Sequence, residues 1–264
     1  MRVLITGCST GFGRGTAREL TERGHEVIAT ARQPKAIDDL DVAQKLALDV
    51  SSDDSVRAAF ADAGRVDALV NNAGIGFTGP VERLPIAEGR RLMETNLFGA
   101  LRTIQAVLPG MREQGNGTIV NVSSVAGRVA PPFDGFYSAT KFALEGLTEA
   151  LKYEVNHFGI KVALIEPGYF ETAFGDNAGR VGRDEAPYDQ LDREWEAASQ
   201  VLRSSDENPD SHAVARAIAD VIEAEDPPFR TPVGSDAELV TGARASMSDA
   251  EFERAMRSTL GIEW

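Results

Sequence analysis

The chain has 264 residues, of which 42% are apolar and 26% charged, and its formal net charge is −14. This length favours one large α/β domain spanning residues 1–264, and the apolar fraction is sufficient for its core. The acidic balance argues against nucleic acid as a partner, because phosphate contacts need surplus lysine and arginine, and against docking on an anionic membrane.

Cysteine content and hydropathy indicate the compartment. Cys8 is the only cysteine, so neither an intrachain disulfide nor a cysteine metal cluster can form. The first apolar run is far too short for a secretory signal, and no segment approaches the roughly 18 apolar residues of a membrane span. We therefore expect a soluble, cytoplasmic protein with no membrane partner.

Short apolar runs alternate with longer segments of helical spacing. The runs are rich in Val, Ile and Leu without polar alternation, which is typical of strands buried on both faces. They cover residues 3–5, 26–30, 46–48, 68–70, 118–122 and 162–165. Between them lie helical patterns such as Leu144, Leu147 and Leu151 before Gly159. Strand–helix alternation predicts a doubly wound parallel sheet with helices on both faces.

The last third of the chain is less regular. A polar stretch at about 175–209 is too long for an ordinary connection, so we expect a partly helical substrate lid over about 170–209. Beyond it, the pattern predicts a helix at 213–222, a short edge strand at 230–233 and a last helix at 249–257.

A glycine-rich turn joins the first predicted strand to the first predicted helix. Glycines let the backbone approach a pyrophosphate, whose charge is stabilised by a helix N-terminus. The spacing is G-x-x-x-G-x-G rather than the general G-x-G-x-x-G, and a ligand-free tight turn is the alternative interpretation. The strand–turn–helix context favours a dinucleotide site. Its candidate cofactor contacts are Gly7, Ser9, Thr10, Gly11, Phe12 and Gly13.

The end of the second predicted strand bears on cofactor choice. NAD sites usually carry an acidic residue about 20 residues beyond the glycines, which accepts hydrogen bonds from the ribose 2′-hydroxyl. Here the acid is missing and Arg32 follows the strand, with Arg14 as a second candidate charge. A guanidinium can bind a 2′-phosphate in bidentate fashion. The sequence therefore favours NADP(H), with NAD(H) and a merely solvated Arg32 as the alternatives.

Tyr137 and Lys141 lie four residues apart at the start of a predicted helix, on one face. A phenol loses its proton near pH 10, and a neighbouring ammonium lowers that pKa. A lowering of about 3 units needs roughly 4 kcal/mol. Tyr137 would then donate a proton to a carbonyl oxygen or accept one from an alcohol. Alone, such a pair usually marks only a helix surface.

Polar residues at the ends of other strands remove that ambiguity. Ser124 follows the fifth strand, Asn72 follows the fourth, and Asn96 lies on the helix between them. In an open parallel sheet the carboxyl ends of the strands line the ligand crevice. We therefore expect the glycine turn, Asn72, Ser124 and the Pro167–Gly168 pair to face one cleft.

In their order and spacing these motifs resemble the short-chain dehydrogenase/reductase family over most of the chain, from about residue 3 to 172. The resemblance implies one Rossmann-fold domain with a seven-stranded parallel sheet. It also implies hydride transfer between NAD(P)(H) and a small-molecule carbonyl or secondary alcohol. The glycine turn and residues 167–172 look somewhat like the hydroxysteroid and retinol dehydrogenase branch. The family commonly forms dimers or tetramers, so we expect a homodimer or homotetramer built on the helices after the fourth and fifth strands.

The resemblance also assigns roles to four residues. Tyr137 would be the general acid/base, and Ser124 would polarise the substrate oxygen. Lys141 would hold the nicotinamide ribose hydroxyls and tune Tyr137, and Asn96 would anchor a water in the proton relay. These assignments make catalysis a property of four positions on three separate segments.

Further cofactor contacts follow from the same resemblance. They are the adenine-side pair Asp49 and Val50, the loop residues Asn72, Ala73 and Gly74, the catalytic Tyr137 and Lys141, and the nicotinamide-side residues Pro167, Gly168, Phe170 and Thr172. Phe12 and Phe170 depart from the family, which usually has aliphatic residues there.

Some alternatives stay open. A cofactor-sensing regulator can share the fold, and an epimerase or dehydratase can use the same site with a tightly held cofactor. The three histidines match no metal-ligand spacing, so no metal site is expected. Phe174 and Trp195 are either anchors over an apolar substrate or ordinary packing of the lid.

Overall fold

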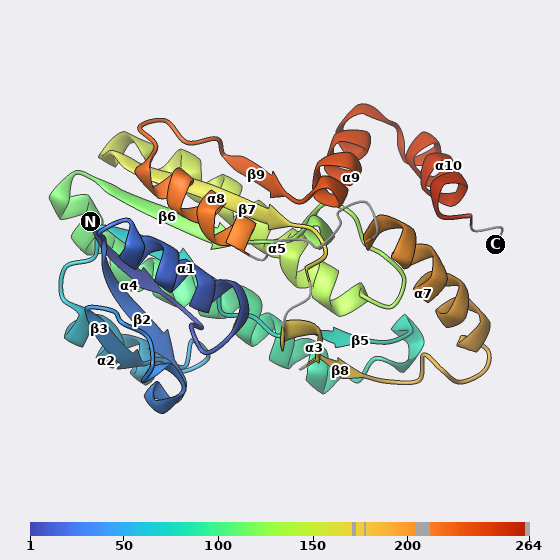
Figure 1. The fold of residues 1–264 in the computed structure, drawn as a ribbon, viewed down its shortest axis with the longest axis horizontal. Helices are drawn as coiled ribbons and strands as arrows, with labels where there is room; N and C mark the ends of the chain where they lie inside the picture. Colours follow the sequence, from blue (N-terminus) through green and yellow to red (C-terminus); the bar gives the residue numbers. More distant parts are fainter. Residues whose placement is uncertain (171–172, 177, 204–211, 262–264) are drawn as a thin grey trace.

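A seven-stranded, all-parallel sheet forms the centre of the computed structural model, which describes residues 1–170, 173–176, 178–203 and 212–261. The strands lie in the order β3-β2-β1-β4-β6-β7-β9, and helices cover both faces (Figure 1). Their bounds are β1 (Arg2–Ile5), β2 (Glu26–Ala31), β3 (Gln44–Ala47), β4 (Ala68–Asn71), β6 (Gly117–Val122), β7 (Ile160–Pro167) and β9 (Arg230–Val233). The predicted fold class is confirmed.

The strand order places the ligand crevice. The chain runs outward from β1 to β2 and β3, then returns and continues through β4, β6, β7 and β9 on the other side. The direction thus reverses between β1 and β4. In open α/β sheets, ligands bind outside the carboxyl ends of the strands at such a switch point.

Ten helices flank the described sheet or extend beyond it. They are α1 (Gly11–Glu22), α2 (Asp53–Ala63), α3 (Ile86–Met93), α4 (Gly99–Gln114), α5 (Gly135–Val155), α6 (Ala173–Asp176), α7 (Asp189–Arg203), α8 (His212–Glu223), α9 (Ser235–Ser246) and α10 (Asp249–Leu260). The last helix runs past the predicted end at 257, and α9 has no counterpart among the sequence predictions.

Two apolar layers hold the helices on the sheet. Alternate residues of β1 point to opposite faces, so Val3 and Ile5 join one layer and Leu4 the other. The first layer includes Leu20 of α1 and Ile218 of α8, and the second includes residues of α2, α4 and α5. This burial on both faces explains why the strand sequences are continuously apolar.

Hydrogen-bonded pairing with neighbouring strands sets the bounds of β3 and β7, which differ from the bounds of their apolar runs. β3 pairs with β2 from Gln44 to Ala47, so it starts and ends earlier than the apolar run 46–48. β7 pairs with β6 from Ile160 and with β9 up to Pro167, and is therefore longer than the predicted 162–165.

Short elements complete the crevice end. A two-stranded parallel sheet joins β5 (Phe77–Thr78) to β8 (Gly179–Arg180), which ties part of the expected lid to the loop after β4. A π-helical turn, η3 (Glu94–Phe98), separates α3 from α4. The 3-10 turns are η1 (Pro34–Ile37), η2 (Val81–Arg83), η4 (Val125–Gly127) and η5 (Asn156–Phe158).

The described parts of the segment 170–209 include α6, β8 and α7. Figure 1 shows α7, α9 and α10 at the same end of the molecule as β5 and β8, away from β3. Ala198 of α7 and Leu260 of α10 pack together with Trp195 and Met256. Within the described residues, no helix combines the length and apolarity that crossing a bilayer requires.

Candidate active site

A cavity of about 2240 Å³ opens at the carboxyl ends of the strands. Pockets for one small ligand usually measure about 300–1,000 Å³, so this one has room for a dinucleotide and a second molecule. The cavity brings together nearly all the predicted site residues: Gly7, Ser9, Thr10, Gly11, Phe12, Arg32, Asp49, Val50, Asn72, Ala73, Gly74, Ser124, Tyr137, Lys141, Pro167, Gly168 and Phe170. Of the others, Gly13 and Asn96 are buried and are not part of this lining, and Thr172 lies outside the described residues.

The glycine turn is closely packed against the loop after β4. Gly7 has a φ of 75°, a conformation that residues with a Cβ rarely adopt. A Cβ on Gly13 would lie 2.3 Å from Asn72 Nδ2 and 2.5 Å from the Gly7 carbonyl oxygen. Gly7 therefore permits the backbone conformation of the turn, and Gly13 permits the close approach of helix α1 to Asn72 and Gly7.

Thr6 and Asn72 fix that turn from within. Asn72 Nδ2 donates hydrogen bonds to the carbonyl oxygens of Thr6 at 2.9 Å and Gly7 at 3.0 Å. The backbone N–H groups of Asn72 and Ala73 both donate to Thr6 Oγ1 at 3.0 Å. Asn72 therefore both holds the glycine turn in place and lines the cavity.

The start of α1 fits a bound pyrophosphate. The N-cap residue Thr10 makes no side-chain capping bond, and the first turn holds no acidic residue. The first N–H groups of a helix lack intrahelical partners and carry partial positive charge. Because they face a roomy cavity beside a glycine turn, these groups suit the phosphates of a dinucleotide.

Arg32 lies at the end of β2 on the cavity wall, exposed and without an ion-pair partner in the described part of the chain. Arg14 differs, because its guanidinium bonds the carboxylate of Asp39 and the backbone carbonyl oxygens of Ser9 at 3.3 Å and Ala36 at 3.2 Å. The bond from Arg14 holds the pKa of Asp39 below its usual value. Arg32 therefore forms no direct ion pair in the described residues, although its charge favours the ionised form of Asp49, whereas Arg14 is neutralised by its partner.

Asp49 presents an ionised hydrogen-bond acceptor to the cavity. Its Oδ1 accepts hydrogen bonds from the backbone N and the Oγ of Ser51, at 2.9 and 2.6 Å. These bonds favour the charged form and hold the pKa of Asp49 below its ordinary value.

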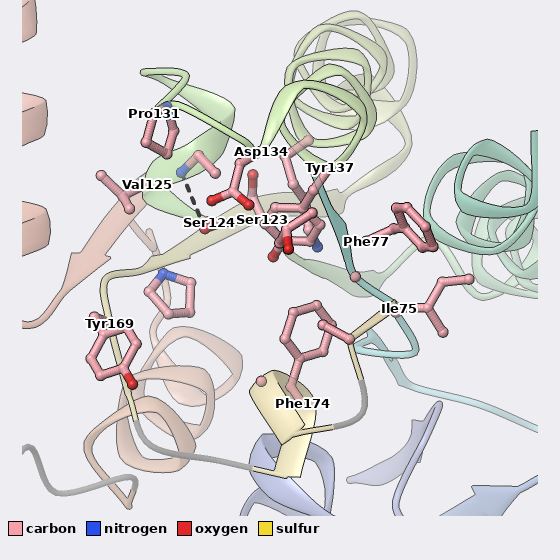
Figure 2. A pocket seen from close by; sticks show the side chains of 18 of the residues that line it. Ile75, Phe77, Ser123, Ser124, Val125, Pro131, Asp134, Tyr137, Tyr169 and Phe174 are labelled. Atoms are coloured by element: carbon pink, nitrogen blue, oxygen red, sulfur yellow. Dashed lines mark hydrogen bonds between the residues drawn. The ribbon is translucent and has the colours of Figure 1, made fainter. Parts of the chain in front are cut away.

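Three polar side chains meet where β6 ends and α5 begins. Ser124 lies two residues after the end of β6, and Tyr137 and Lys141 occupy the first two turns of α5. Lys141 is 6% exposed, and its Nζ donates to the Val122 carbonyl oxygen at 2.8 Å and lies 5.7 Å from the centre of the Tyr137 ring. Figure 2 shows Ser124 and Tyr137 on the same wall of the pocket, facing Phe174.

The pKa of Tyr137 is shifted in the opposite direction from the one that the sequence predicts. Burial raises the pKa of Tyr137 above its ordinary value, and a hydrogen bond with Ser124 acts in the opposite direction. Burial also lowers the pKa of Lys141 to about 8, while the nearby Glu145 works against this shift. The expected lowering of the Tyr137 pKa by Lys141 is absent here, because desolvation dominates and the ammonium bonds a backbone carbonyl.

Asn96 is 2% exposed and lies in the π-helical turn. Its Oδ1 accepts from the Ile75 backbone N, and its Nδ2 donates to the Ile75 carbonyl oxygen, both at 2.9 Å. The Nδ2 also donates to Thr140 Oγ1 at 3.1 Å. This side chain ties the loop after β4 to α5, and its expected role in anchoring a water stays a prediction.

Several cavity residues escaped the sequence analysis. Asp236 of α9 accepts a hydrogen bond from the Tyr169 backbone N at 2.7 Å, and a Cβ on Gly168 would lie 2.1 Å from its Oδ1. Asp236 thus shapes the segment after β7 in the way that Asn72 shapes the glycine turn. No local pattern indicates this, because the contact joins segments far apart in sequence. Other lining residues that were missed include Asp134, Arg183, Val240, Phe252, Met256 and Leu260.

Aromatic contacts join predicted residues to one another. Phe12 and Phe170, the two departures from the family pattern, stack edge to face with ring centres 5.5 Å apart. The ring of Phe174 lies 5.5 Å from that of Tyr137, and both Phe174 and Trp195 line the cavity. Phe12 and Phe170 therefore pack against each other beside the cavity.

The comparison with protein families decides the identity. The family model described as short chain dehydrogenase matches residues 1–181. The chain belongs to the short-chain dehydrogenase family. As a short-chain dehydrogenase it is an NAD(P)-dependent oxidoreductase that acts on CH–OH and C=O groups.

Similarity to individual proteins supports this family assignment. It is 38% identical to 3-ketodihydrosphingosine reductase of Bacteroides thetaiotaomicron, over 97% of this chain and 96% of that protein. It is also 38% identical to human retinol dehydrogenase 8, over 86% of this chain and 79% of that one. The crystal structure of a short-chain dehydrogenase from Streptomyces avermitilis matches with a TM-score of 0.81 and 36% identity, covering 100% and 98% of the two chains.

Proposed function

We propose that this short-chain dehydrogenase interconverts a small-molecule ketone and its secondary alcohol with Tyr137 as the general acid/base. The supporting observation is the convergence of Ser124, Tyr137 and Lys141 in one cavity with the glycine turn. The two hydroxyls suit a carbonyl oxygen between them, which Ser124 polarises by a hydrogen bond and to which Tyr137 transfers its proton. Burial keeps the phenol protonated, and this form is the one needed for reduction.

Other residues hold the coenzyme. The start of α1 and the glycine turn suit the pyrophosphate, Asp49 and Val50 the adenine side, and Pro167 to Phe170 the nicotinamide side. Bound there, the nicotinamide supplies or accepts the hydride. Lys141, on the wall of the cavity, would hold the ribose hydroxyls. We propose NADP(H) as the preferred coenzyme, because Arg32 is exposed and lacks an ion-pair partner among the described residues.

The segment 170–209 is proposed to cover the substrate. In its described parts, Phe174 packs against Tyr137, and Trp195 lines the cavity.

A homodimer or homotetramer is proposed through the helices after β4 and β6. Exposed aromatic side chains on or next to these helices support it: Phe98 is 44%, Phe142 46% and Tyr153 73% exposed.

Coenzyme oxidation tests the proposal. Purified protein and NADPH are mixed with ketones of several classes, including steroids, retinoids and long-chain ketones, and NADPH absorbance is followed. We expect net, stoichiometric oxidation with at least one class. Tight NADPH binding without net oxidation by any class would contradict a dehydrogenase and leave an epimerase or a sensor.

A further inference from the structure

Asp134 places an unused carboxylate beside the proposed catalytic tyrosine. It is the N-cap residue of α5, three positions before Tyr137, half-buried and on the cavity wall. Figure 2 shows its side chain next to Ser124 and Tyr137. An aspartate at an N-cap usually accepts a hydrogen bond from the first turn of its helix, but Asp134 makes no such capping bond. Its carboxylate is therefore available to the cavity.

The surrounding protein does not neutralise this carboxylate. In the described part of the chain, no side chain donates a hydrogen bond to it. The cation that favours its charged form is Arg183, whose Nε and Nη2 already bind Asp192 Oδ1 at 2.6 and 2.5 Å. The Arg183 guanidinium also stacks over Phe133, 4.7 Å from the ring centre. Asp134 thus lacks a dedicated partner.

An uncompensated charge at this position is unfavourable in two ways. Burial raises the pKa of Asp134 to about 6, so the group is mostly ionised at neutral pH but poorly solvated. Its negative charge also raises the pKa of Tyr137 and so opposes formation of the phenolate. A cation bound between the two groups would remove both penalties.

The far part of the cavity has a different character. The described parts of α7, α9 and α10 line it with both apolar and charged side chains: Trp195, Val240, Phe252, Met256 and Leu260 stand among Glu196, Ser199, Asp236, Arg244, Asp249, Glu253 and Arg257. The apolar members can bind hydrocarbon, because burial of apolar area is favourable by roughly 25 cal/mol per Å². A substrate that uses both regions has a cationic group near its carbonyl and an apolar tail.

We propose that Asp134 determines specificity by binding a protonated amine within two carbons of the substrate carbonyl, and that the substrate is a long-chain amino ketone or the matching amino alcohol. The inference rests on the proposed function, because Tyr137 must face the carbonyl for Asp134 to face the amine. The close positions of residues three apart on a helix keep both groups within reach of one small head group.

Matched substrates and variants test this inference. A long-chain 2-amino-3-ketone and the same ketone without the amino group are compared by kcat/KM for NADPH oxidation. Wild type is expected to prefer the amino ketone by about 10–100-fold, as for a hydrogen bond between charged groups. Asp134→Asn keeps the side-chain volume and should bring this ratio close to one, mainly by raising KM for the amino ketone. Glu154→Gln removes an exposed carboxylate from the same helix and should leave the ratio unchanged.

The outcomes separate the inference from the proposed function. A ratio near one in wild type, or an unchanged ratio in Asp134→Asn, would overturn the role of Asp134 even if plain ketones are reduced. Absence of NADPH oxidation with every ketone would instead reject the proposed function. If Asp134→Asn does not fold, the N-acetylated amino ketone replaces it, because acetylation removes the positive charge. With the wild-type protein, kcat/KM for the N-acetylated amino ketone should be lower than for the charged amino ketone by the same factor of about 10–100. Equal kcat/KM values for the charged and acetylated forms would overturn the inference.

Discussion

At the residue scale, Gly13 is where the glycine turn has least space. A Cβ there would meet Asn72 Nδ2 at 2.3 Å, so Gly13→Ala should displace the Asn72 amide that holds the turn. We expect a loss of about 1–3 kcal/mol in the free energy of unfolding, as for other overpacked sites, together with weaker NADPH binding. Denaturant unfolding and a fluorescence titration measure the two effects.

Gly15 supplies the control for this prediction. It lies on the same helix, and a Cβ there would sit 3.7 Å from the Ala215 Cβ, an ordinary contact. Gly15→Ala should be neutral or stabilising by up to about 1 kcal/mol, because alanine favours the helix. Equal tolerance of the two substitutions would show that the turn does not depend on this close approach.

Arg32 carries the prediction about the coenzyme. Arg32→Asp replaces a cation that can bind a 2′-phosphate by an anion that repels it and can accept bonds from a 2′-hydroxyl. The ratio of kcat/KM for NADPH over NADH should fall by at least tenfold. Lys35→Asp makes the same charge change in η1, away from the cavity wall, and should shift the ratio far less. Identical ratios in wild type and Arg32→Asp would remove Arg32 from coenzyme selection.

The sequence identifies those site residues whose positions are set by short-range spacing along the chain. The glycine turn, Tyr137 and Lys141 can be recognised because short-range spacing places them. Asp134 was not singled out, because an aspartate before a helix normally indicates only a cap. The sequence also does not show that Arg183, which favours the charged form of Asp134, lies near it.

At the element scale, buried hydrogen bonds link the central strands to the helices that cover them. Asn71 Nδ2 of β4 donates to Asn121 Oδ1 of β6 at 2.9 Å, and Asn121 Nδ2 donates to Thr148 Oγ1 of α5 at 2.8 Å. Thr103 Oγ1 of α4 donates to Asn71 Oδ1 at 2.6 Å. These polar groups are buried and satisfied by one another, and they fix the helices relative to the strands that end at the active site.

Asn121→Ala should therefore lower the free energy of unfolding by about 2–4 kcal/mol, because it leaves the buried amide of Asn71 without its acceptor and removes a second bond. The exposed loop residue Asn116 is the control, and Asn116→Ala should change stability by less than about 0.5 kcal/mol. Urea unfolding of the three proteins gives the answer. Similar midpoints for both variants would mean that the buried bonds add nothing to stability.

Sequence patterns predicted the strands of the main sheet and missed the helix α9 and the shortest elements. Six of these strands followed from apolar runs, which burial on both faces of a sheet demands, and β9 matches the predicted edge strand at 230–233. β5 and β8 have two residues each, so they show no periodicity, and only their pairing defines them. The π-helical turn at Asn96 keeps the residue spacing of a helix and differs only in its hydrogen bonds.

At the scale of the whole molecule, the active site is assembled from both ends of the chain. The glycine turn comes from the first strand crossover, whereas Asp236, Phe252 and Leu260 come from the last two helices. The parallel-sheet rule predicted that the strand ends meet in one cleft, and the structure confirms it. That rule does not place α10, because this helix packs against α7 and α9.

One measurement tests the central claim most directly: hydride transfer and coenzyme binding compared in wild type and Tyr137→Phe. The substitution removes the hydroxyl and keeps the ring that packs against Phe174. We expect kcat with a ketone substrate to fall by at least 10²-fold, the usual contribution of a general acid, while the Kd for NADPH stays within about threefold. Retention of wild-type kcat in a folded, NADPH-binding Tyr137→Phe protein would contradict the assignment of Tyr137 as the proton donor.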